Sequence, residues 1–209
     1  AWGVDFEWIK KQYAPGMMAK SGITVSRWID GVMEKNELID QDSNLRGVFF
    51  WGHAPNSQTR GLEMKKAMDK LDLLVVVDPF PSATAAMAAM PSKDANPNRA
   101  VYLLPATTQF ETSGSCTASN RSIQWREKVI DPLWDSRTDH MIMYQLAQKL
   151  GFDKELVKNY KMVKGKGGMD EPETESILRE INKSVWTIGY TGQSPERLKA
   201  HMRNMNVFD

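Results

Sequence analysis

The chain has 209 residues, with 27 basic and 26 acidic side chains and a single cysteine. This balanced charge does not fit a nucleic-acid partner, and no apolar run approaches the roughly 20 residues that a membrane-spanning helix needs. One cysteine excludes an internal disulfide and any metal cluster held only by cysteines of this chain.

Residues 1–45 predict a helical lead-in. Phe6, Ile9 and Tyr13 recur at helical spacing, and a second such series follows at Val25, Trp28, Ile29 and Met33. We expect two short helices without a core of their own. Either the α/β core covers their tryptophans, or these belong to a surface that excision from a larger protein left bare. Because the chain starts Ala1-Trp2-Gly3 without an initiator methionine, we interpret it as a fragment or a processed product.

Residues 46–151 predict an α/β domain. Three short apolar runs, at 48–51, 73–77 and 101–104, alternate with an amphipathic segment (61–71) and a small-residue helix (82–90). The central run lacks polar alternation, which is typical of a strand covered on both faces. We therefore expect a Rossmann-like parallel sheet flanked by helices, with helical N- and C-terminal extensions.

The second half of this domain is expected to contain more irregular structure. The polar stretch 107–122 predicts a long, structureless loop, which we expect to be mobile together with 91–99. Met143, Leu146, Ala147 and Leu150 then indicate a helix, with Ser136 or Thr138 as its N-cap and Gly151 at its end.

Residues 152–209 predict a helical C-terminal extension. A charged, glycine-rich linker is expected at 161–175, with its lysines in solvent, followed by helices at 174–182 and 195–205. Between these helices the sequence WTIGYTGQ predicts an aromatic turn.

Two elements at the expected carboxyl edge of the sheet carry chemistry. In the loop WGHAPNSQT, Gly52 would let a ligand approach the backbone, although an ordinary strand–helix turn also uses glycine, proline and asparagine. Asp78, at the tip of the central strand, would accept hydrogen bonds from a ribose diol or from a guanine edge. The alternative is a turn or N-cap aspartate preceding Pro79.

Other reactive residues offer weaker hypotheses. His53, Glu111 and Cys116 have the chemistry of a thiol-protease set, but nothing in the sequence places them together and the local signatures of such enzymes are absent. His53 has no second ligand at metal-binding spacing, so the sequence predicts no metal site. There is also no G-x-G-x-x-G and no P-loop.

Six elements in order resemble the large subunit of molybdenum- or tungsten-dependent formate dehydrogenases, within the molybdopterin oxidoreductase family. They lie in WGHAPNSQT (51–59), LDLLVVVDPFPSATA (71–85) and YLLPATTQFETSGSCTASNRSIQWREKVIDPLWDSRTDHMIMYQLAQKLGF (102–152). The tail WTIGYTGQSPERLKAHM (186–202) resembles one formate dehydrogenase branch. DPFP is also similar to a motif of nitrate reductases, which are the alternative within the family.

The resemblance implies a metal held by two molybdopterin guanine dinucleotides, one of them bound by this region, and an iron–sulfur cluster elsewhere in the parent enzyme. Gly52, His53 and Ala54 would offer backbone to the diphosphate or ribose. Asn56, Gln58 or Thr59 would add a side-chain contact, and Asp78, followed by Pro79, would bind the guanine edge. The loop 111–124 would face the pterin. The family's cluster cysteines and metal-ligating residue are missing here, so no catalytic or metal residue is assigned and this piece alone is expected to be inactive.

The parent reaction implied by the resemblance is the oxidation of formate to carbon dioxide with transfer of two electrons. The expected partners are the rest of the large subunit and an electron-transfer subunit carrying iron–sulfur or flavin and NAD. The elements GHAPNSQT and WTIGYTGQ resemble the cytoplasmic, NAD-linked branch more than the membrane-bound periplasmic one, so we expect a cytoplasmic assembly, with a periplasmic one as the alternative. A stand-alone nucleotide-binding domain that lost the chemistry is the alternative from a different class.

Overall fold

The computed structural model describes residues 5–13, 23–39, 41–53, 60–120, 122–184 and 192–202. It divides into two compact units. The first consists of Ala1–Met17 together with Thr107–Asp209, and the second is the continuous segment Met18–Ala106. This boundary cuts through the expected domain 46–151, and the three-part division at residues 45 and 151 stays a prediction.

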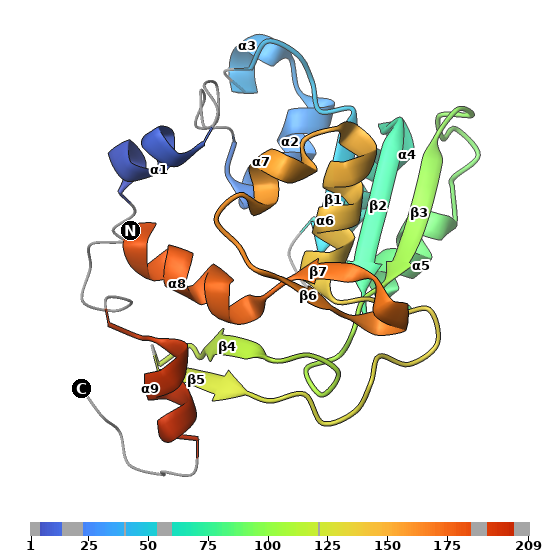
Figure 1. Ribbon diagram of the computed structural model, residues 1–209. Helices are drawn as coiled ribbons and strands as arrows, with labels where there is room; N and C mark the ends of the chain where they lie inside the picture. Colours follow the sequence, from blue (N-terminus) through green and yellow to red (C-terminus); the bar gives the residue numbers. More distant parts are fainter. Residues whose placement is uncertain are drawn as a thin grey trace. The chain divides into compact units, whose positions relative to one another are not determined.

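The second unit contains the predicted parallel sheet, in the order β1-β2-β3 (Figure 1). Its strands are β1 (Gly47–Trp51), β2 (Leu73–Asp78) and β3 (Ala100–Pro105). Gly47 pairs with Leu73, and Leu73 with Ala100, so the three strands start level with one another. The predicted fold class and the positions of its strands are confirmed.

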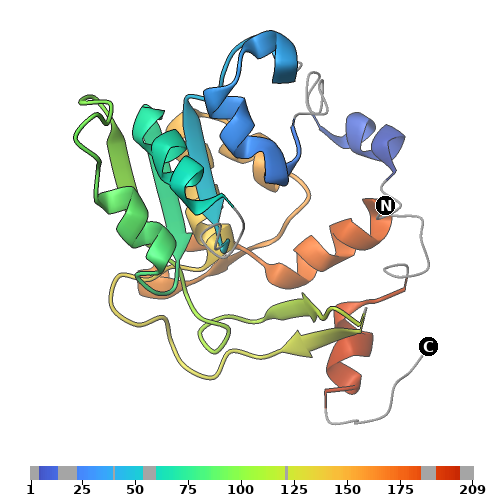
Figure 2. The ribbon, with the colours of Figure 1, turned by 180° about the vertical axis from the view of Figure 1, so that it is seen from behind.

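Two helices cover one face of this sheet. Figure 2 shows α4 (Gly61–Lys70) and α5 (Ala83–Ala89) in front of the strands, as two consecutive crossovers on the same side. Ser82 caps α5 by accepting a hydrogen bond from the backbone N of Ala85. Side chains of both helices and of β1 and β2 form one buried apolar cluster, which includes Met64, Ala67, Met68, Leu71, Leu74, Val76, Ala85 and Ala88.

The lead-in contributes to this core. A 3₁₀ turn (Val25–Arg27) precedes α2 (Trp28–Met33) and the short α3 (Asn36–Ile39). Trp28 is buried, with its ring edge-on to that of Phe50 at 5.2 Å between centroids. The expectation that the α/β core covers a lead-in tryptophan is confirmed for Trp28. The predicted first helix, α1 (Phe6–Gln12), belongs to the other unit.

The prediction of a structureless loop at 107–122 is wrong. β4 (Gly114–Thr117) pairs antiparallel with β5 (Ile123–Arg126), and Trp125 of β5 is buried with Leu178 and Leu198. Strands of four residues give no long apolar run, and the local sequence does not show that Trp125 and Ile123 of β5 pack against Leu178 and Leu198.

The helix predicted near 143–150 is α6 (Asp139–Leu150). Thr138 is its N-cap and Gly151, at φ +80°, is its C-cap, as predicted. Its buried face is formed by Met141, Ile142 and Ala147, whereas Met143 and Leu150, two of the residues that indicate the helix, are exposed. The short α7 (Asp153–Val157) follows. Helix α6 has 12 residues, far fewer than the roughly 20 that a membrane-spanning helix needs. None of the described helices is long and apolar enough to cross a bilayer.

The prediction of a linker at 161–175 is also wrong. β6 (Met162–Lys164) and β7 (Asp170–Pro172) form a second antiparallel hairpin, and a 3₁₀ turn (Lys166–Gly168) joins them. Gly167 and Gly168 both have positive φ, at +63° and +75°, so glycines that predicted a flexible linker serve a tight turn.

Two helices close the described chain, as predicted. They are α8 (Thr174–Ser184) and α9 (Pro195–Ala200), the latter with Ser194 as N-cap. α9 ends at Ala200, before the expected limit, and residues 203–209 lie outside the described part. Most of the predicted aromatic turn WTIGYTGQ (186–193), namely residues 186–191, is also outside it.

The segment 91–99 is tied to the second unit by hydrogen bonds. Asp69 is buried and accepts from Lys65 Nζ at 2.7 Å, from the backbone N of Ser92 at 3.3 Å and from Arg99 at 3.2 Å. Asn96 donates to the Asp72 carboxylate at 2.8 Å. The mobility expected for this segment stays a prediction, but its backbone is anchored at two points.

Candidate functional site

The carboxyl edge of the sheet brings together two of the predicted site residues. Trp51, the last residue of β1, pairs with Val77, so Gly52 and Asp78 each follow a member of this pair. The pairing continues past β1, because Gly52 N donates to Val77 O at 3.0 Å. Carboxyl ends of parallel strands are where such sheets bind ligands.

Gly52 has φ +55°, a conformation that favours glycine, and a Cβ built at this position would meet no atom within 4 Å. The space beside it is therefore open. Its N–H, however, is already used by the Val77 carbonyl. If this loop binds a diphosphate through backbone N–H groups, we therefore expect the N–H donors to belong to residues after Gly52.

Asp78 initiates a tight turn. Its Oδ1 accepts from the backbone N of Phe80 at 3.0 Å, and Ser82 N donates to Phe80 O at 2.7 Å. Pro79 occupies the centre of this turn. This is the hydrogen bond expected of a turn aspartate, and it involves one oxygen of the half-buried carboxylate.

Phe80 was missed in the sequence. Its side chain is 68% exposed, two residues after the carboxylate of Asp78. An exposed aromatic ring beside a hydrogen-bond acceptor suits a planar heterocycle. The signal available in the sequence is an aromatic residue in the turn that follows an acid at a strand end.

The remaining predicted residues are only partly described. His53 is half-buried, and its ring lies 6.5 Å from that of Phe50 with the planes inclined by 31°. Ala54, Asn56 and Thr59 lie outside the described residues. Within the described ranges, no group of three or more histidine, cysteine, aspartate or glutamate side chains is arranged to hold a metal ion.

Glu111 has a structural task. It is buried, and its carboxylate accepts from the backbone N and the Oγ1 of Thr108, both at 2.7 Å, and from Leu133 N at 2.6 Å. Burial raises the pKa of Glu111, but these hydrogen bonds outweigh burial and hold the pKa below its usual range.

These bonds leave the thiol-protease hypothesis unsupported. Cys116 lies in β4, paired across the hairpin with Gln124. The Glu111 carboxylate is occupied by backbone and hydroxyl donors, and His53 belongs to the other compact unit.

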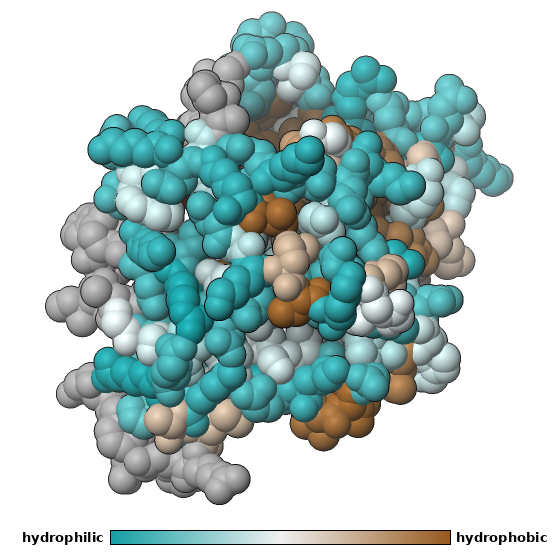
Figure 3. Space-filling model, viewed as in Figure 1, coloured by the Kyte–Doolittle hydropathy of each residue, from teal (hydrophilic) through white to brown (hydrophobic). Residues whose placement is uncertain are grey.

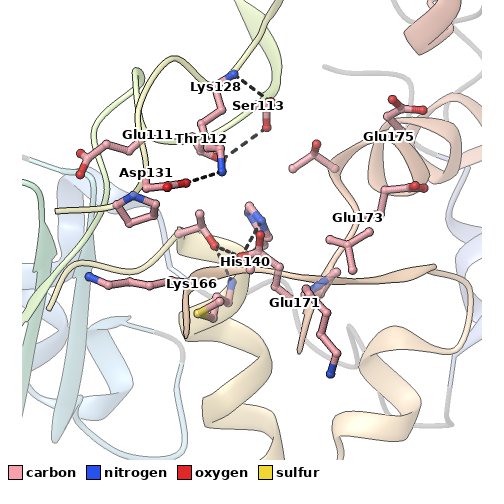
Figure 4. A pocket seen from close by; sticks show the side chains of 18 of the residues that line it. Glu111, Thr112, Ser113, Lys128, Asp131, His140, Lys166, Glu171, Glu173 and Glu175 are labelled. Atoms are coloured by element: carbon pink, nitrogen blue, oxygen red, sulfur yellow. Dashed lines mark hydrogen bonds and ion pairs between the residues drawn. The ribbon is translucent and has the colours of Figure 1, made fainter. Parts of the chain in front are cut away.

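The first unit contains a polar cavity of about 460 Å³ (Figure 4). Glu171 accepts from Thr138 Oγ1 at 2.6 Å and lies 3.5 Å from His140 Nε2. Burial alone would raise the pKa of Glu171. The hydrogen bonds from His140 and Thr138 outweigh this effect, so the pKa is lowered. Lys128 pairs with Asp131 at 2.8 Å at the rim. Because the hairpins and helices that line it come from distant parts of the sequence, no local motif predicts this cavity.

Comparison with known proteins gives a consistent assignment. Residues 12–149 match the family model for molybdopterin oxidoreductase. A trimethylamine-N-oxide reductase of Vibrio cholerae is 29% identical over 177 residues, which cover 78% of this chain and 18% of that protein. The alpha subunit of an F420-dependent formate dehydrogenase of Methanocaldococcus jannaschii is 28% identical over 180 residues, covering 86% of this chain and 21% of the subunit.

A putative formate dehydrogenase of Staphylococcus aureus is 26% identical over 145 residues, or 69% of this chain and 13% of that protein. The chain therefore spans about a fifth or less of the length of these relatives. The family match covers well over half of the chain, including the whole parallel sheet and the turn at Asp78. On this match the chain belongs to the molybdopterin oxidoreductase family.

Proposed function

We propose that this chain is the part of a formate dehydrogenase catalytic subunit that binds one molybdopterin guanine dinucleotide. The observation that carries the proposal is the paired end of β1 and β2, with open space at Gly52 and the carboxylate of Asp78 after the neighbouring strand. Two of the similar proteins are named formate dehydrogenases, and the tail at 186–202 resembles one branch of these enzymes.

The residues present fit a guanine nucleotide. Asp78 would accept the two N–H donors of the guanine edge, and the exposed ring of Phe80 would offer an apolar face to the base. Gly52 would admit the ligand's close approach, and His53, Ala54, Asn56 and Thr59 would supply backbone and side-chain contacts. When bound, the cofactor supplies the metal centre at which two electrons are exchanged; this chain's residues bind and orient the nucleotide.

Asp78→Asn and Asp78→Ala distinguish the two roles of this residue, which are to accept the hydrogen bond of the turn and to bind the guanine edge. Asparagine keeps an Oδ1 that accepts from Phe80 N, so the turn survives. Its NH₂ group, however, replaces the second carboxylate oxygen, and this N–H donor would then face an N–H donor of the guanine edge. Hydrogen bonds to a charged acceptor are worth roughly 1.5–3 kcal/mol each, so the subunit encoded by the complete reading frame should lose most of its bound guanine nucleotide. The measurement is guanosine monophosphate released by acid hydrolysis, per mole of protein.

The matched control is Asp94→Asn, which makes the same charge change on an exposed residue of the loop before β3. It should leave both nucleotide content and melting temperature unchanged. Asp78→Ala should lose nucleotide and also about 0.5–1 kcal/mol of stability, because it removes the turn acceptor. Full nucleotide content in Asp78→Asn would mean that Asp78 serves the turn alone.

The substrate needs a separate assay, because a trimethylamine-N-oxide reductase is as similar to this chain as the formate dehydrogenases are. We propose formate, with the rest of the large subunit and a cytoplasmic electron-transfer subunit as partners. The complete subunit should reduce a viologen dye with formate. Oxidation of reduced dye by trimethylamine N-oxide or nitrate, without formate activity, would assign a reductase instead. A chain that binds guanine nucleotide but is encoded without further domains would be the stand-alone binding domain.

A further inference from the structure

An exposed apolar patch lies on the loop between β5 and α6. It consists of Val129, Ile130, Leu133 and Trp134, together with Phe110 beside them. Trp134 is 88% exposed and Val129 74%. In Figure 3 hydrophobic side chains gather at the lower edge of the molecule, where Figure 1 draws the loop after β5. We call these five residues the apolar loop patch.

The backbone under this patch is held firmly. The backbone N atoms of Val129 and Ile130 both donate to Phe110 O, at 2.8 and 3.1 Å, and Leu133 N donates to the buried carboxylate of Glu111. Lys166 reaches across from the second hairpin, and its ammonium donates to the carbonyls of Leu133, Trp134 and Ser136. The loop therefore presents its apolar side chains from a fixed backbone.

Trp134 is also in an unfavourable backbone conformation. Its φ of +45° lies in the left-handed region, which a bulky side chain rarely adopts. Strain of this kind persists where the surroundings impose it, and it gathers at functional surfaces. Here the carboxylate of Glu111 and the ammonium group of Lys166 hold the backbone on either side of Trp134. The ring of Trp134 is left exposed to solvent.

These features indicate an interface, because a loop with no task beyond connection has no need of adjacent exposed apolar residues. The five side chains of the patch carry no charge, and Lys128 and Asp131 beside them pair with each other at 2.8 Å, so the patch fits an apolar partner. The exposed Asp135 lies at its edge. About four fifths of the length of two similar proteins lies outside the region they share with this chain. We propose that the apolar loop patch packs against an apolar segment of the remaining polypeptide of the same catalytic subunit, an inference that rests on the proposed function.

Hydroxyl-radical footprinting tests this directly. Trypsin cleaves after Lys128 and Arg137, so residues 129–137 form one peptide that contains four of the five patch residues. Its oxidation rate is measured in the 209-residue chain and in the subunit encoded by the complete reading frame. We expect severalfold slower oxidation of Trp134 in the complete subunit, and a rate in the short chain that does not change with protein concentration.

Equal rates in the two proteins would overturn the proposal. Protection that grows with the concentration of the short chain would also overturn it, because a second copy would then be the partner. If the complete subunit retains guanine nucleotide and formate activity while Trp134 stays accessible, the docking inference fails and the proposed function stands. If nucleotide and formate activity are absent, the proposed function fails regardless of the footprint.

A pair of substitutions gives an independent readout. Trp134→Glu and Leu150→Glu each replace an exposed apolar side chain of the first unit, but Leu150 lies at the opposite end of α6. Trp134→Glu should lower the melting temperature of the complete subunit and not that of the short chain. Equal effects of both variants in the complete subunit would show that the patch is no special surface.

Discussion

At the scale of single residues, Glu111 shows how a reactive side chain in a sequence becomes a structural anchor in the fold. Its carboxylate joins Thr108, at the start of the first unit's long segment, to Leu133, 22 positions further along the chain than Glu111. No spacing rule connects these positions, because the link depends on how the loops meet. The sequence alone offered a catalytic hypothesis for Glu111, and its hydrogen bonds give it an architectural role.

Glu111→Gln should destabilise the chain by about 1–3 kcal/mol, because an amide NH₂ would replace an acceptor at a site surrounded by donors. The measurement is urea unfolding of this chain followed by tryptophan fluorescence. Glu37→Gln, on an exposed side chain of α3, is the matched control and should change the midpoint little. Equal midpoints for the two variants would contradict the anchoring role.

The same carboxylate predicts a pH dependence. Because the folded pKa of Glu111 is lowered, its contribution to stability is fully present above the ordinary glutamate pKa of about 4.3 and is lost as the pH falls through the folded value. Wild-type stability should therefore decline as the pH drops below about 4, and the decline should be shallower in Glu111→Gln. Parallel curves for both proteins would show that other carboxylates control acid unfolding.

Trp134 offers a test of backbone strain. Trp134→Gly and Trp134→Ala both remove the ring, but only glycine relaxes the left-handed φ of +45°. We expect the glycine variant of this chain to be more stable than the alanine variant by about 1 kcal/mol. Thermal melts of the two variants measure the difference, and an alanine variant of equal stability would show that the backbone shifts at no cost.

At the scale of elements, the hairpin β6–β7 supports the loop before α6 through Lys166. Lys166→Ala should leave the carbonyls of Leu133, Trp134 and Ser136 without this donor and loosen residues 133–136, at a cost of about 1–2 kcal/mol. Hydrogen exchange over this segment is the measurement. Lys164→Ala, which removes only an ion pair with Asp170 at 2.6 Å between exposed side chains, is the control and should leave exchange at 133–136 unchanged.

The elements divide clearly into those that the sequence predicts and those that it does not. β2 is buried, and side chains of β1 and β3 such as Phe50 and Val101 pack with helices of the same segment, so the apolar runs of these strands are visible in the sequence. Helix α6 carries its own cap residues at Thr138 and Gly151. The two hairpins, in contrast, have strands of three or four residues without an apolar run. Their stability comes from pairing and from contacts distant in sequence, which no local period reveals.

The candidate site follows the same division. Gly52 and Asp78 are found because each follows an apolar run, and the pairing of β1 with β2 brings these strand ends together. The use of the Gly52 N–H within the sheet could not be predicted, since it depends on strand register. No local motif predicts the polar cavity or the Lys166 contacts, which join residues 30 or more positions apart.

At the scale of the whole molecule, we propose that the chain binds a nucleotide, and no group of three or more histidine, cysteine, aspartate or glutamate side chains in its described part is arranged to hold a metal ion. We expect the 209-residue chain to reduce no viologen dye with formate, whichever of molybdate or tungstate is supplied during expression. The complete subunit, assayed alongside, is the positive control. Formate-dependent reduction by the short chain would contradict its proposed role as one part of a catalytic subunit.

The division into units also fixes an order of events during synthesis. The second unit, Met18–Ala106, is continuous, whereas the first needs Ala1–Met17 as well as residues beyond 107. The N-terminal helix is secured by Asp5 N donating to Ser184 O at 2.7 Å and by the hydroxyl of Tyr13 bonded to Glu180. On the ribosome, the sheet can thus fold while α1 waits, without its partners, until residues 180–184 have emerged. Helix α1 is made before the sheet but finds its place after it, and in the interval its apolar side chains are open to chaperones.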